Sequence, residues 1–242
     1  MKIFGVSDLH LSFKRKYDPT NPPPLTKPMD IFGSQWDNYP ARIRKNWLDT
    51  VSSDDTVLIP GDISWAMNLQ EACYDLDFIG DLPGKKIICR GNHDYWWDGV
   101  GKVRNALPAG ISALQHDALD IGGFAVCATR GWLLPEHNDF KENTDRKIYD
   151  RELLRLGFAL DAAAKYGKPI ILMLHYPPVD DTGHESDFTR IIREYNVSYC
   201  VYGHIHGSAA EAFQGEINGT SFYNVSADKL ECRPLLICEN AG

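Results

Sequence analysis

The chain lacks a long apolar run. Within its 242 residues the longest unbroken aliphatic stretch, Ile170 to Leu174, is far shorter than the roughly 20 residues that a membrane-spanning helix needs. The N-terminus also lacks the basic and apolar segments of a signal peptide and passes directly into a strand-like run. We therefore expect no membrane partner and a cytoplasmic location.

The sequence also lacks closely paired cysteines and an excess of positive charge. Its six cysteines are scattered without the CxxC spacing of zinc or redox sites, which predicts free thiols. With 25 basic and 33 acidic side chains the net charge is −8, which argues against tight, sequence-independent binding of extended nucleic acid. A nuclease with a local basic patch remains compatible with this charge.

What the sequence does contain is an alternation of strand and helix patterns. Five short apolar runs of β-prone residues are found at Lys2–Val6, Thr56–Ile59, Lys86–Cys89, Ile170–Leu174 and Tyr199–Tyr202. Helical periodicity is found between them at 38–51, 69–80 and 145–166. This alternation predicts an α/β fold with a largely parallel sheet that is covered by helices on both faces.

Two stretches depart from the alternation. Residues 111–128 and 217–238 hold short strand-like runs, and the second includes a predicted hairpin turn at Asn218-Gly219. They predict antiparallel strands added to the sheet, or a second sheet. Because the chain shows no internal repeat and no linker, we expect a single domain over residues 1–242.

Each of the five strand-like runs ends in carboxylate, amide or imidazole side chains. In chain order these are Asp8, His10, Asp62, Asn92, His175, His204 and His206. The carboxyl ends of parallel strands meet at one sheet edge, so we expect these side chains to converge. Oxygen and imidazole donors without thiolates suit Mn, Fe, Co, Ni or Zn. Seven donors are too many for one catalytic ion and are suited to two ions that share a bridging carboxylate.

Taken in order, these residues resemble the motifs of the calcineurin-like metallophosphoesterase family. The matching segments are Asp8-x-His10, Gly61-Asp62, Gly91-Asn92-His93-Asp94, His175 and Gly203-His204-x-His206. Flanking segments, such as the one that contains Trp65, resemble a bacterial branch of that family. The resemblance implies a sandwich of two packed mixed β-sheets flanked by α-helices. It also implies a metal-dependent phosphoric ester hydrolase.

The resemblance assigns a role to each motif residue. The implied metal ligands are Asp8, His10 and His206 for one ion, Asn92, His175 and His204 for the other, and Asp62 as the bridge between them. Both ions would be divalent, with manganese the favoured occupant among Mn, Fe, Zn, Co and Ni. His93 matches the general acid, and Asp94 is the expected partner that orients its ring.

The implied reaction is hydrolysis of a phosphomonoester or phosphodiester of a small molecule or nucleotide. Two adjacent cations lower the pKa of a shared water, so that a metal-bridging hydroxide can attack phosphorus while His93 protonates the leaving oxygen. We expect Asn92, His93 and Arg130 to contact the substrate, although Arg130 could equally form a structural ion pair. The alternatives are a nuclease that acts on nucleic-acid ends and a catalytically silent scaffold with the same fold.

Three further features allow two interpretations each. The aromatic residues Tyr95, Trp96 and Trp97 could stack on a substrate or pack a helix against the sheet. Residues 14–33 hold five of the 14 prolines, which predicts an irregular loop that either rims the site or is a simple elaboration. The basic run at residues 14–16 could meet an anionic substrate or lie on a solvated surface.

Overall fold

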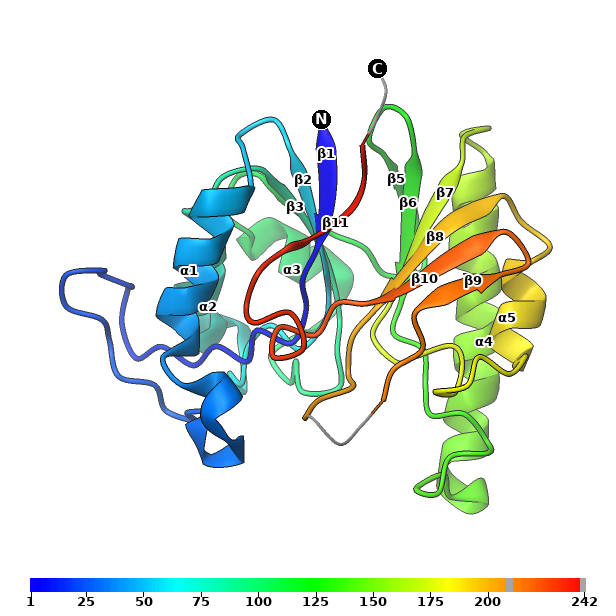
Figure 1. Cartoon of the computed structure of the whole chain (residues 1–242), viewed down its shortest axis with the longest axis horizontal. Helices are drawn as coiled ribbons and strands as arrows, with labels where there is room; N and C mark the ends of the chain where they lie inside the picture. The colour runs from blue at the N-terminus through cyan, green and yellow to red at the C-terminus, as the bar shows by residue number, and fades with distance from the viewer. Residues whose placement is uncertain (208–210, 240–242) are drawn as a thin grey trace.

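Two β-sheets packed face to face form the centre of the molecule, with helices on both outer sides (Figure 1). The computed structural model describes residues 1–207 and 211–239. Within these ranges no helix is both long enough and apolar enough to cross a membrane. The six cysteines all lie there and are unpaired, as their spacing predicted.

The first sheet has five strands in the order β11-β1-β2-β3-β4. Their bounds are Lys2–Gly5 for β1, Thr56–Pro60 for β2, Lys85–Cys89 for β3, Ile111–Ala113 for β4 and Leu235–Glu239 for β11. Strands β1 to β4 are parallel, and β11 pairs antiparallel with β1. The parallel strands therefore all present their carboxyl ends at the same edge.

The second sheet has six strands in the order β5-β6-β7-β8-β10-β9. Their bounds are Ala118–Asp120 for β5, Ala125–Thr129 for β6, Ile170–Leu174 for β7, Val197–Tyr202 for β8, Gly215–Ile217 for β9 and Thr220–Asn224 for β10. Strands β5 and β9 are antiparallel to their neighbours and the others are parallel. The predicted hairpin is confirmed, because Asn218 and Gly219 join β9 to β10 with φ values of 53° and 83°.

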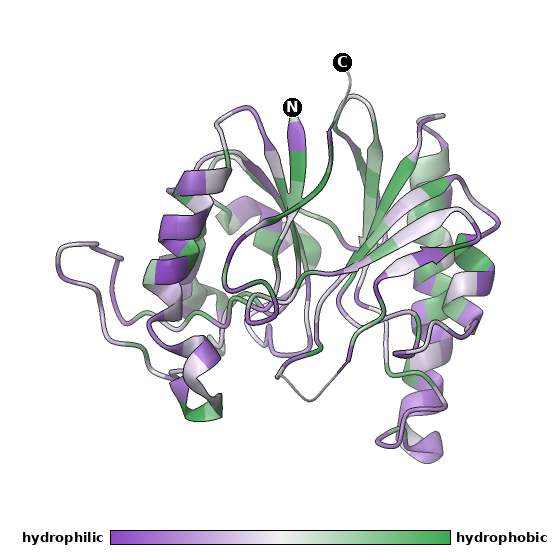
Figure 2. Cartoon of the chain, viewed as in Figure 1, coloured by the Kyte–Doolittle hydropathy of each residue, from purple (hydrophilic) through white to green (hydrophobic). Residues whose placement is uncertain are grey.

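Three helices pack on the outer face of the first sheet and two on that of the second (Figure 1). The first group is α1 (Tyr39–Thr50), α2 (Leu69–Gly80) and α3 (Val100–Ala106), and the second is α4 (Glu142–Ala164) and α5 (Asp187–Ile192). Apolar residues lie mainly in the strands between the helix layers, and hydrophilic residues cover the outward sides of the helices (Figure 2). Two single-turn 3₁₀ helices, Asp30–Phe32 and Ser34–Trp36, precede α1.

Alternate residues of each strand enter different cores, which explains the unbroken apolar runs. In β2, Leu58 packs between the sheets, whereas Val57 and Ile59 pack under the helices. In β7, Ile171 faces the other sheet and Leu172 faces α4. A strand buried on both faces has no polar side, so its sequence is apolar throughout.

The three helices predicted from periodicity are confirmed within a few residues, as is the α/β sandwich of two mixed sheets. The single sheet covered on both faces that the alternation predicted is wrong. The apolar runs predict burial on both faces but do not distinguish a helix layer from a second sheet. Helices α3 and α5 were not predicted, because seven and six residues are too few for a helical period to stand out.

Candidate metal centre

The loops that leave the strands take up a backbone conformation that is rare outside glycine. Four expected ligands have positive φ values: 57° at Asp8, 45° at His10, 51° at Asp62 and 71° at His204. Such residues cost about 1 to 3 kcal/mol each and tend to gather at functional sites. Strain at four of the seven expected ligand positions therefore supports a functional centre at this edge.

These loops approach each other so closely that two motif positions require glycine. Gly61 has a φ of 90°, and a Cβ atom there would lie 2.6 Å from the Cα atom of Gly91. A Cβ atom on Gly91 would collide with the side chain and backbone of Asp62. The backbone N–H of Asp8 donates to the Gly61 carbonyl at 3.0 Å, which joins the loops after β1 and β2. The glycines of the motifs thus have a steric role.

A first cluster of candidate ligands consists of Asp8, His10 and His206, whose ligand atoms all lie within 4.8 Å of one another. The Nε2 atom of His206 lies 3.2 Å from Asp8 Oδ1 and 3.3 Å from the Nε2 atom of His10. Asp8 and His10 are buried. One cation between these three atoms would accept electron pairs from all of them.

A second cluster consists of Asp8, Asp62 and His175. Asp62 Oδ2 lies 3.5 Å from the Nε2 atom of His175, which in turn is 2.6 Å from the side-chain oxygen of Asn92. The other oxygen, Asp62 Oδ1, accepts a hydrogen bond from the backbone of His93 at 2.8 Å. Asp62 Oδ2 is buried and has no hydrogen-bond partner within the described ranges. A buried carboxylate oxygen without a donor fits a bound cation.

Electrostatics favour neutral imidazoles at His175, in the second cluster, and at the neighbouring His204. Burial lowers the pKa of His175 to about 4 and that of His204 to about 3, so both rings are neutral and keep a lone pair near neutral pH. Burial raises the pKa of Asp62 well above its usual value, and the nearby Asp8 and Asp94 carboxylates add to the effect. A cation would relieve this repulsion among carboxylates.

One residue that the sequence interpretation missed is Asp228. Its carboxylate accepts from the backbone N–H of Gly207 at 2.8 Å and lies 3.0 Å from the Nδ1 atom of His206. Burial alone would lower the pKa of His206, but Asp8 and Asp228 outweigh it and raise that pKa to about 10. Asp228 thereby directs the Nε2 atom of His206 toward the first cluster. The polar residues that follow the strand-like run 220–224 were the available signal.

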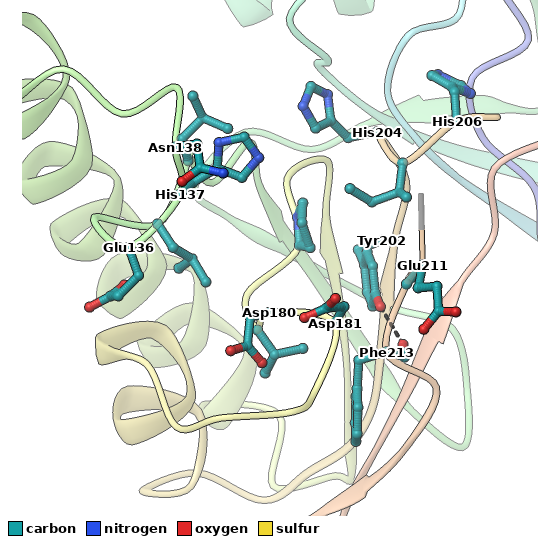
Figure 3. A pocket seen from close by; sticks show the side chains of 16 residues that line it. Glu136, His137, Asn138, Asp180, Asp181, Tyr202, His204, His206, Glu211 and Phe213 are labelled. Carbon is teal, nitrogen blue, oxygen red and sulfur yellow. Dashed lines mark hydrogen bonds between the residues drawn. The ribbon is translucent and has the colours of Figure 1, made fainter. Parts of the chain in front are cut away.

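His204 has a different setting from the other candidate ligands. Its ring centroid is 5.1 Å from that of His175 and 4.2 Å from that of Tyr176, and its backbone N–H donates to the carboxylate of Asp8. In the described part of the chain neither cluster of ligand atoms includes it. Figure 3 shows the His204 and His206 rings at separate positions above a cavity. A ligand role for His204 stays a prediction.

Residues 1–208 match the family model of calcineurin-like phosphoesterases. The chain belongs to the calcineurin-like phosphoesterase family. It is 26% identical over 201 residues to the Gene 66 protein of Mycobacterium phage L5, covering 83% of this chain and 75% of the phage protein. A crystal structure of a protein of unknown function from Aquifex aeolicus aligns over 97% of this chain and 94% of its own, with a TM-score of 0.48 and 16% identity.

Membership in this family makes the protein a metal-dependent phosphoesterase in the broad sense, and the aspartate and histidine clusters supply groups that can hold divalent ions. The candidate ligands lie on five loops, which follow strands of both sheets. Residues that follow strands of both sheets of this phosphoesterase therefore contribute to the candidate metal centre.

His93 lies at the side of the first cluster. Its ring centroid is 4.4 Å from that of Trp65 and 5.7 Å from that of His10, and its Nδ1 atom is 3.4 Å from the hydroxyl of Tyr95. Burial lowers its pKa below the usual value. The imidazole ring of His93 is thus held by packing against Trp65, an aromatic contact that the sequence interpretation missed.

The expectation that Asp94 orients the His93 ring is wrong. Asp94 is fully buried, and its two carboxylate oxygens accept five hydrogen bonds from other groups. The donors, at 2.8 to 3.2 Å, are the backbone N–H groups of Asp62, Ile63, Ser64 and Gly91 and the indole of Trp96. Asp94 therefore ties the loop after β2 to the loop after β3.

The aromatic residues after His93 divide between the two interpretations. Trp96 and Trp97 are buried in the core under the helices, so packing is their role. Tyr95 is 48% exposed and is the member of this triplet that faces the site.

The proline-rich loop, residues 14–33, lies at the rim of the site. The residue that reaches the site is Lys27, which lies outside the basic run at residues 14–16. Lys27 places its Nζ atom 5.2 Å from the centroid of the Trp65 ring, and its backbone N–H donates to the hydroxyl of Ser12 at 3.0 Å. In the basic run, Lys16 pairs with Asp81 at 3.6 Å on the surface. The solvated interpretation of that run is therefore favoured, and Lys27 is the cation nearest to His93 from this loop.

Arg130 forms no ion pair in the part of the chain that the structure describes. Its guanidinium carbon lies 4.5 Å from the centroid of the Trp132 ring, and its carbonyl accepts from the backbone of His175 at 3.0 Å. Its Nε atom is buried without a partner within the same ranges. The structural-ion-pair alternative is wrong, and the guanidinium remains available to an anion.

A cavity of about 600 Å³ opens beside His204 and His206 (Figure 3). Its wall carries four carboxylates, which belong to Glu136, Asp180, Asp181 and Glu211. Apolar groups of the wall include Phe213, whose carbonyl accepts from the hydroxyl of Tyr202. The space next to the candidate ligands is therefore acidic and partly apolar.

Proposed function

We propose that this phosphoesterase hydrolyses a phosphomonoester or phosphodiester of a small molecule or nucleotide, with two divalent ions at the strand-end ligands. The observation that carries the proposal is the buried Asp62 Oδ2 atom, which has no donor within the described ranges and lies between the Nε2 atoms of His10 and His175, 3.8 and 3.5 Å away. Manganese is the occupant that we favour among Mn, Fe, Zn, Co and Ni, all of which suit oxygen and imidazole donors.

The resemblance to the family motifs suggests how the ligand set would divide between the two ions. One ion would be held by Asp8, His10 and His206, the other by Asn92, His175 and His204, and Asp62 would bridge them. When bound, the ions supply positive charge that activates water and neutralises phosphoryl oxygens. The close approach of Asp8 to both clusters supports a shared centre.

The chain's own groups then act on the leaving side of the phosphoryl group. His93 is positioned by Trp65 and by its backbone bond to Asp62, and its protonated form would donate a proton to the leaving oxygen. Lys27, over the Trp65 ring, would add positive charge next to the phosphoryl oxygens. Both residues lie on the open side of the first cluster, where His93 is only half-buried.

The cavity beside the ligands favours a small substrate over a nucleic-acid strand. A nuclease needs a basic path for the phosphates on both sides of the cleaved bond. The four carboxylates of the 600 Å³ cavity repel such a strand. A nucleotide or other small phosphoester would place its neutral or cationic portion against the four carboxylates of this cavity.

A metal-reconstituted activity panel tests the proposal. The full chain, loaded with Mn, Ni, Co, Fe or Zn, is assayed against monoesters, diesters, nucleotides and a phosphopeptide. We expect turnover of at least one small phosphoester that a chelator abolishes and added metal restores. Asp62→Asn should abolish it, whereas Asp98→Asn, on the surface beside Lys102, should not. Metal binding without turnover of any compound would instead favour a silent scaffold.

A further inference from the structure

A second cavity lies beside the metal centre, where β3, β4 and β6 end against α4. It has a volume of about 220 Å³, and four arginines line it: Arg90, Arg130, Arg151 and Arg155. We call it the arginine cavity. Such a concentration of positive charge is unexpected in a chain whose net charge is −8.

The arginine cavity contains donors that nothing in the described ranges satisfies. The Nε atoms of Arg90 and Arg130 are both buried and have no hydrogen-bond partner there. A buried N–H group without an acceptor is costly, and an absent ion or water is a usual explanation. Two such groups on neighbouring guanidinium groups point to an acceptor that both can reach.

The positive charge of the cavity is also poorly balanced. Arg155 pairs with the buried Glu152 at 2.6 Å, and Glu152 also accepts from the hydroxyl of Thr129. The other three arginines have no such partner. Within residues 1–207 and 211–239, no carboxylate oxygen lies within 4.0 Å of their guanidinium nitrogens. In the described ranges, only one carboxylate, that of Glu152, therefore pairs within 4.0 Å with any of the four guanidinium groups.

Guanidinium groups match the geometry of one ligand class in particular. Their planar forks donate two parallel hydrogen bonds to phosphate oxygens, and several arginines around one phosphate are a common arrangement. His116 also lines the cavity and adds a ring nitrogen that can donate. The cavity, at about 220 Å³, has room for a phosphate group and is far smaller than a strand of nucleic acid.

We propose that the arginine cavity binds a phosphate group, at a site separate from the metal ligands. It adjoins them, because Arg90 is two residues before Asn92 and the carbonyl of Arg130 accepts from the backbone of His175. The phosphate can come from two sources: a second phosphoryl group of the substrate or free inorganic phosphate. The first source rests on the proposed function, and the second does not.

Binding is tested without any turnover. The Zn-loaded full chain is titrated with inorganic phosphate while the imidazole signal of His116 is followed by NMR and assigned by its loss in His116→Gln. We expect a saturable shift of that signal. Arg151→Gln should weaken the apparent affinity about tenfold. Arg151 is exposed and has no ion pair within the described ranges, so this variant should fold normally.

A matched variant and a salt series serve as controls. Arg146→Gln lies on the same helix, outside the cavity, and removes a charge that pairs with Glu142. It should leave the affinity unchanged, and sodium chloride of equal ionic strength should not reproduce the shift. The proposal fails if the His116 signal does not respond, if chloride moves it equally, or if Arg151→Gln binds phosphate as tightly as the unaltered protein.

Kinetics then distinguish the two sources of phosphate. If the cavity holds a second phosphoryl group of the substrate, Arg151→Gln should raise KM for a bisphosphate about tenfold and leave KM for the matched monophosphate unchanged. If it holds free phosphate, both KM values should stay the same while added phosphate changes turnover only when Arg151 is present. Failure of the proposed function would abolish turnover on every substrate and leave the NMR titration intact.

Discussion

At the scale of single residues, the buried centre combines the neutral imidazoles of His175 and His204 with a carboxylate oxygen that has no donor. Asp62 Oδ2 has no hydrogen-bond partner within the described ranges, whereas the lowered pKa values of His175 and His204 leave lone pairs free. Without a cation such an arrangement would destabilise the fold. The chemistry of these few side chains therefore explains why the loops need an ion.

His93→Gln should reduce kcat by about 10² to 10⁴, because general acid catalysis by a positioned side chain contributes about that much. The metal content should stay unchanged, since only the backbone of His93 bonds to a candidate ligand. Steady-state kinetics and elemental analysis of the same sample measure both effects. His184→Gln, at an exposed ring beside Asp180, is the control. Unchanged turnover in metal-replete His93→Gln would exclude the role.

Asp228→Asn should weaken metal affinity about 10- to 100-fold, as is typical of groups that orient a metal-ligating histidine. An asparagine oxygen can accept from His206 or from the backbone of Gly207, but its amide cannot replace the second carboxylate oxygen. Competition with a chromophoric chelator measures the affinity. A variant that binds metal as tightly as the unaltered protein would show that Asp228 does not act through His206.

At the scale of elements, single carboxylates hold the loops and helices around the centre. Asp94 joins the loops after β2 and β3, and Asp75 of α2 accepts from the backbone of Phe13 at 2.8 Å and from the hydroxyl of Ser64. Both side chains are buried. Loop geometry at the site thus depends on carboxylates that are not among the candidate ligands.

Asp94→Asn should destabilise the fold by about 2 to 4 kcal/mol, because the amide nitrogen would face backbone N–H donors that now reach a carboxylate oxygen. Metal affinity should fall with it, since the loop that carries Asp62 loses its anchor. Urea unfolding with and without metal measures both. Asp98→Asn is the surface control. A loss of kcat with normal stability and metal content would instead indicate a direct role in the reaction.

Asp75 should make stability depend on pH. Burial raises its pKa from 3.8 to about 7, so the folded protein keeps a proton between about pH 4 and 7 that the unfolded chain releases. The contribution of Asp75 to the free energy of unfolding is therefore greatest below pH 4. It falls as the pH rises to 7, by at most about 1.4 kcal/mol per unit of pKa shift. Asp75→Asn should remove that decline.

Urea unfolding at pH 5 and pH 8 measures the difference between Asp75→Asn and the unaltered chain. The variant should gain stability relative to the unaltered protein at pH 8 more than at pH 5. Asp77→Asn, on the same helix and only partly buried, is the matched control. An equal difference at the two pH values would contradict the raised pKa of Asp75.

At the scale of the whole molecule, the candidate ligands connect the two sheets. Asp8, Asp62 and Asn92 follow strands of the first sheet, and His175 and His206 follow strands of the second. An ion held from both sides would bind the folded state and not the unfolded chain. Metal binding should therefore stabilise the sandwich as a unit.

Saturation with metal at about 100 times Kd should add about 2.7 kcal/mol, or about 5 to 10 °C in Tm for a chain of this size. Calorimetry of the chelator-treated and reconstituted protein measures the shift. Asp62→Asn should lose most of it, and Asp98→Asn should keep it. An equal shift in both variants would place the bound metal elsewhere.

Much of the fold could be predicted because its strands and helices carry strong local patterns. The run Ile170–Leu174 forms β7 with the predicted bounds, and Asn68 caps α2 by accepting from the backbone of Glu71 at 3.0 Å. The turn at Asn218-Gly219 formed because both residues tolerate positive φ. The pattern left a second sheet as one of two alternatives for residues 111–128 and 217–238, since a buried strand has the same apolar sequence under a helix or under another sheet.

The site could be predicted only as far as side-chain type and order allow. Asp8, Asp62 and His175 were expected to meet and do. Strand direction explains this for Asp8 and Asp62, which follow parallel strands of one sheet, whereas His175 joins them from the second sheet. Which way a side chain turns at a strand end depends on backbone torsions and on neighbours from distant segments. For that reason Asp94 was misassigned and the support from Asp228 was missed.

The sequence by itself determined the alternating elements, the order of the candidate ligands and their placement at the carboxyl ends of strands, because these follow from local periodicity and chain order. Only the tertiary structure decided which oxygen of Asp62 lacks a donor, that Asp94 is a loop anchor, and that Arg90 and Arg130 share a cavity. Those outcomes depend on groups far apart in the chain, whose distances are set by the packing of one sheet on the other.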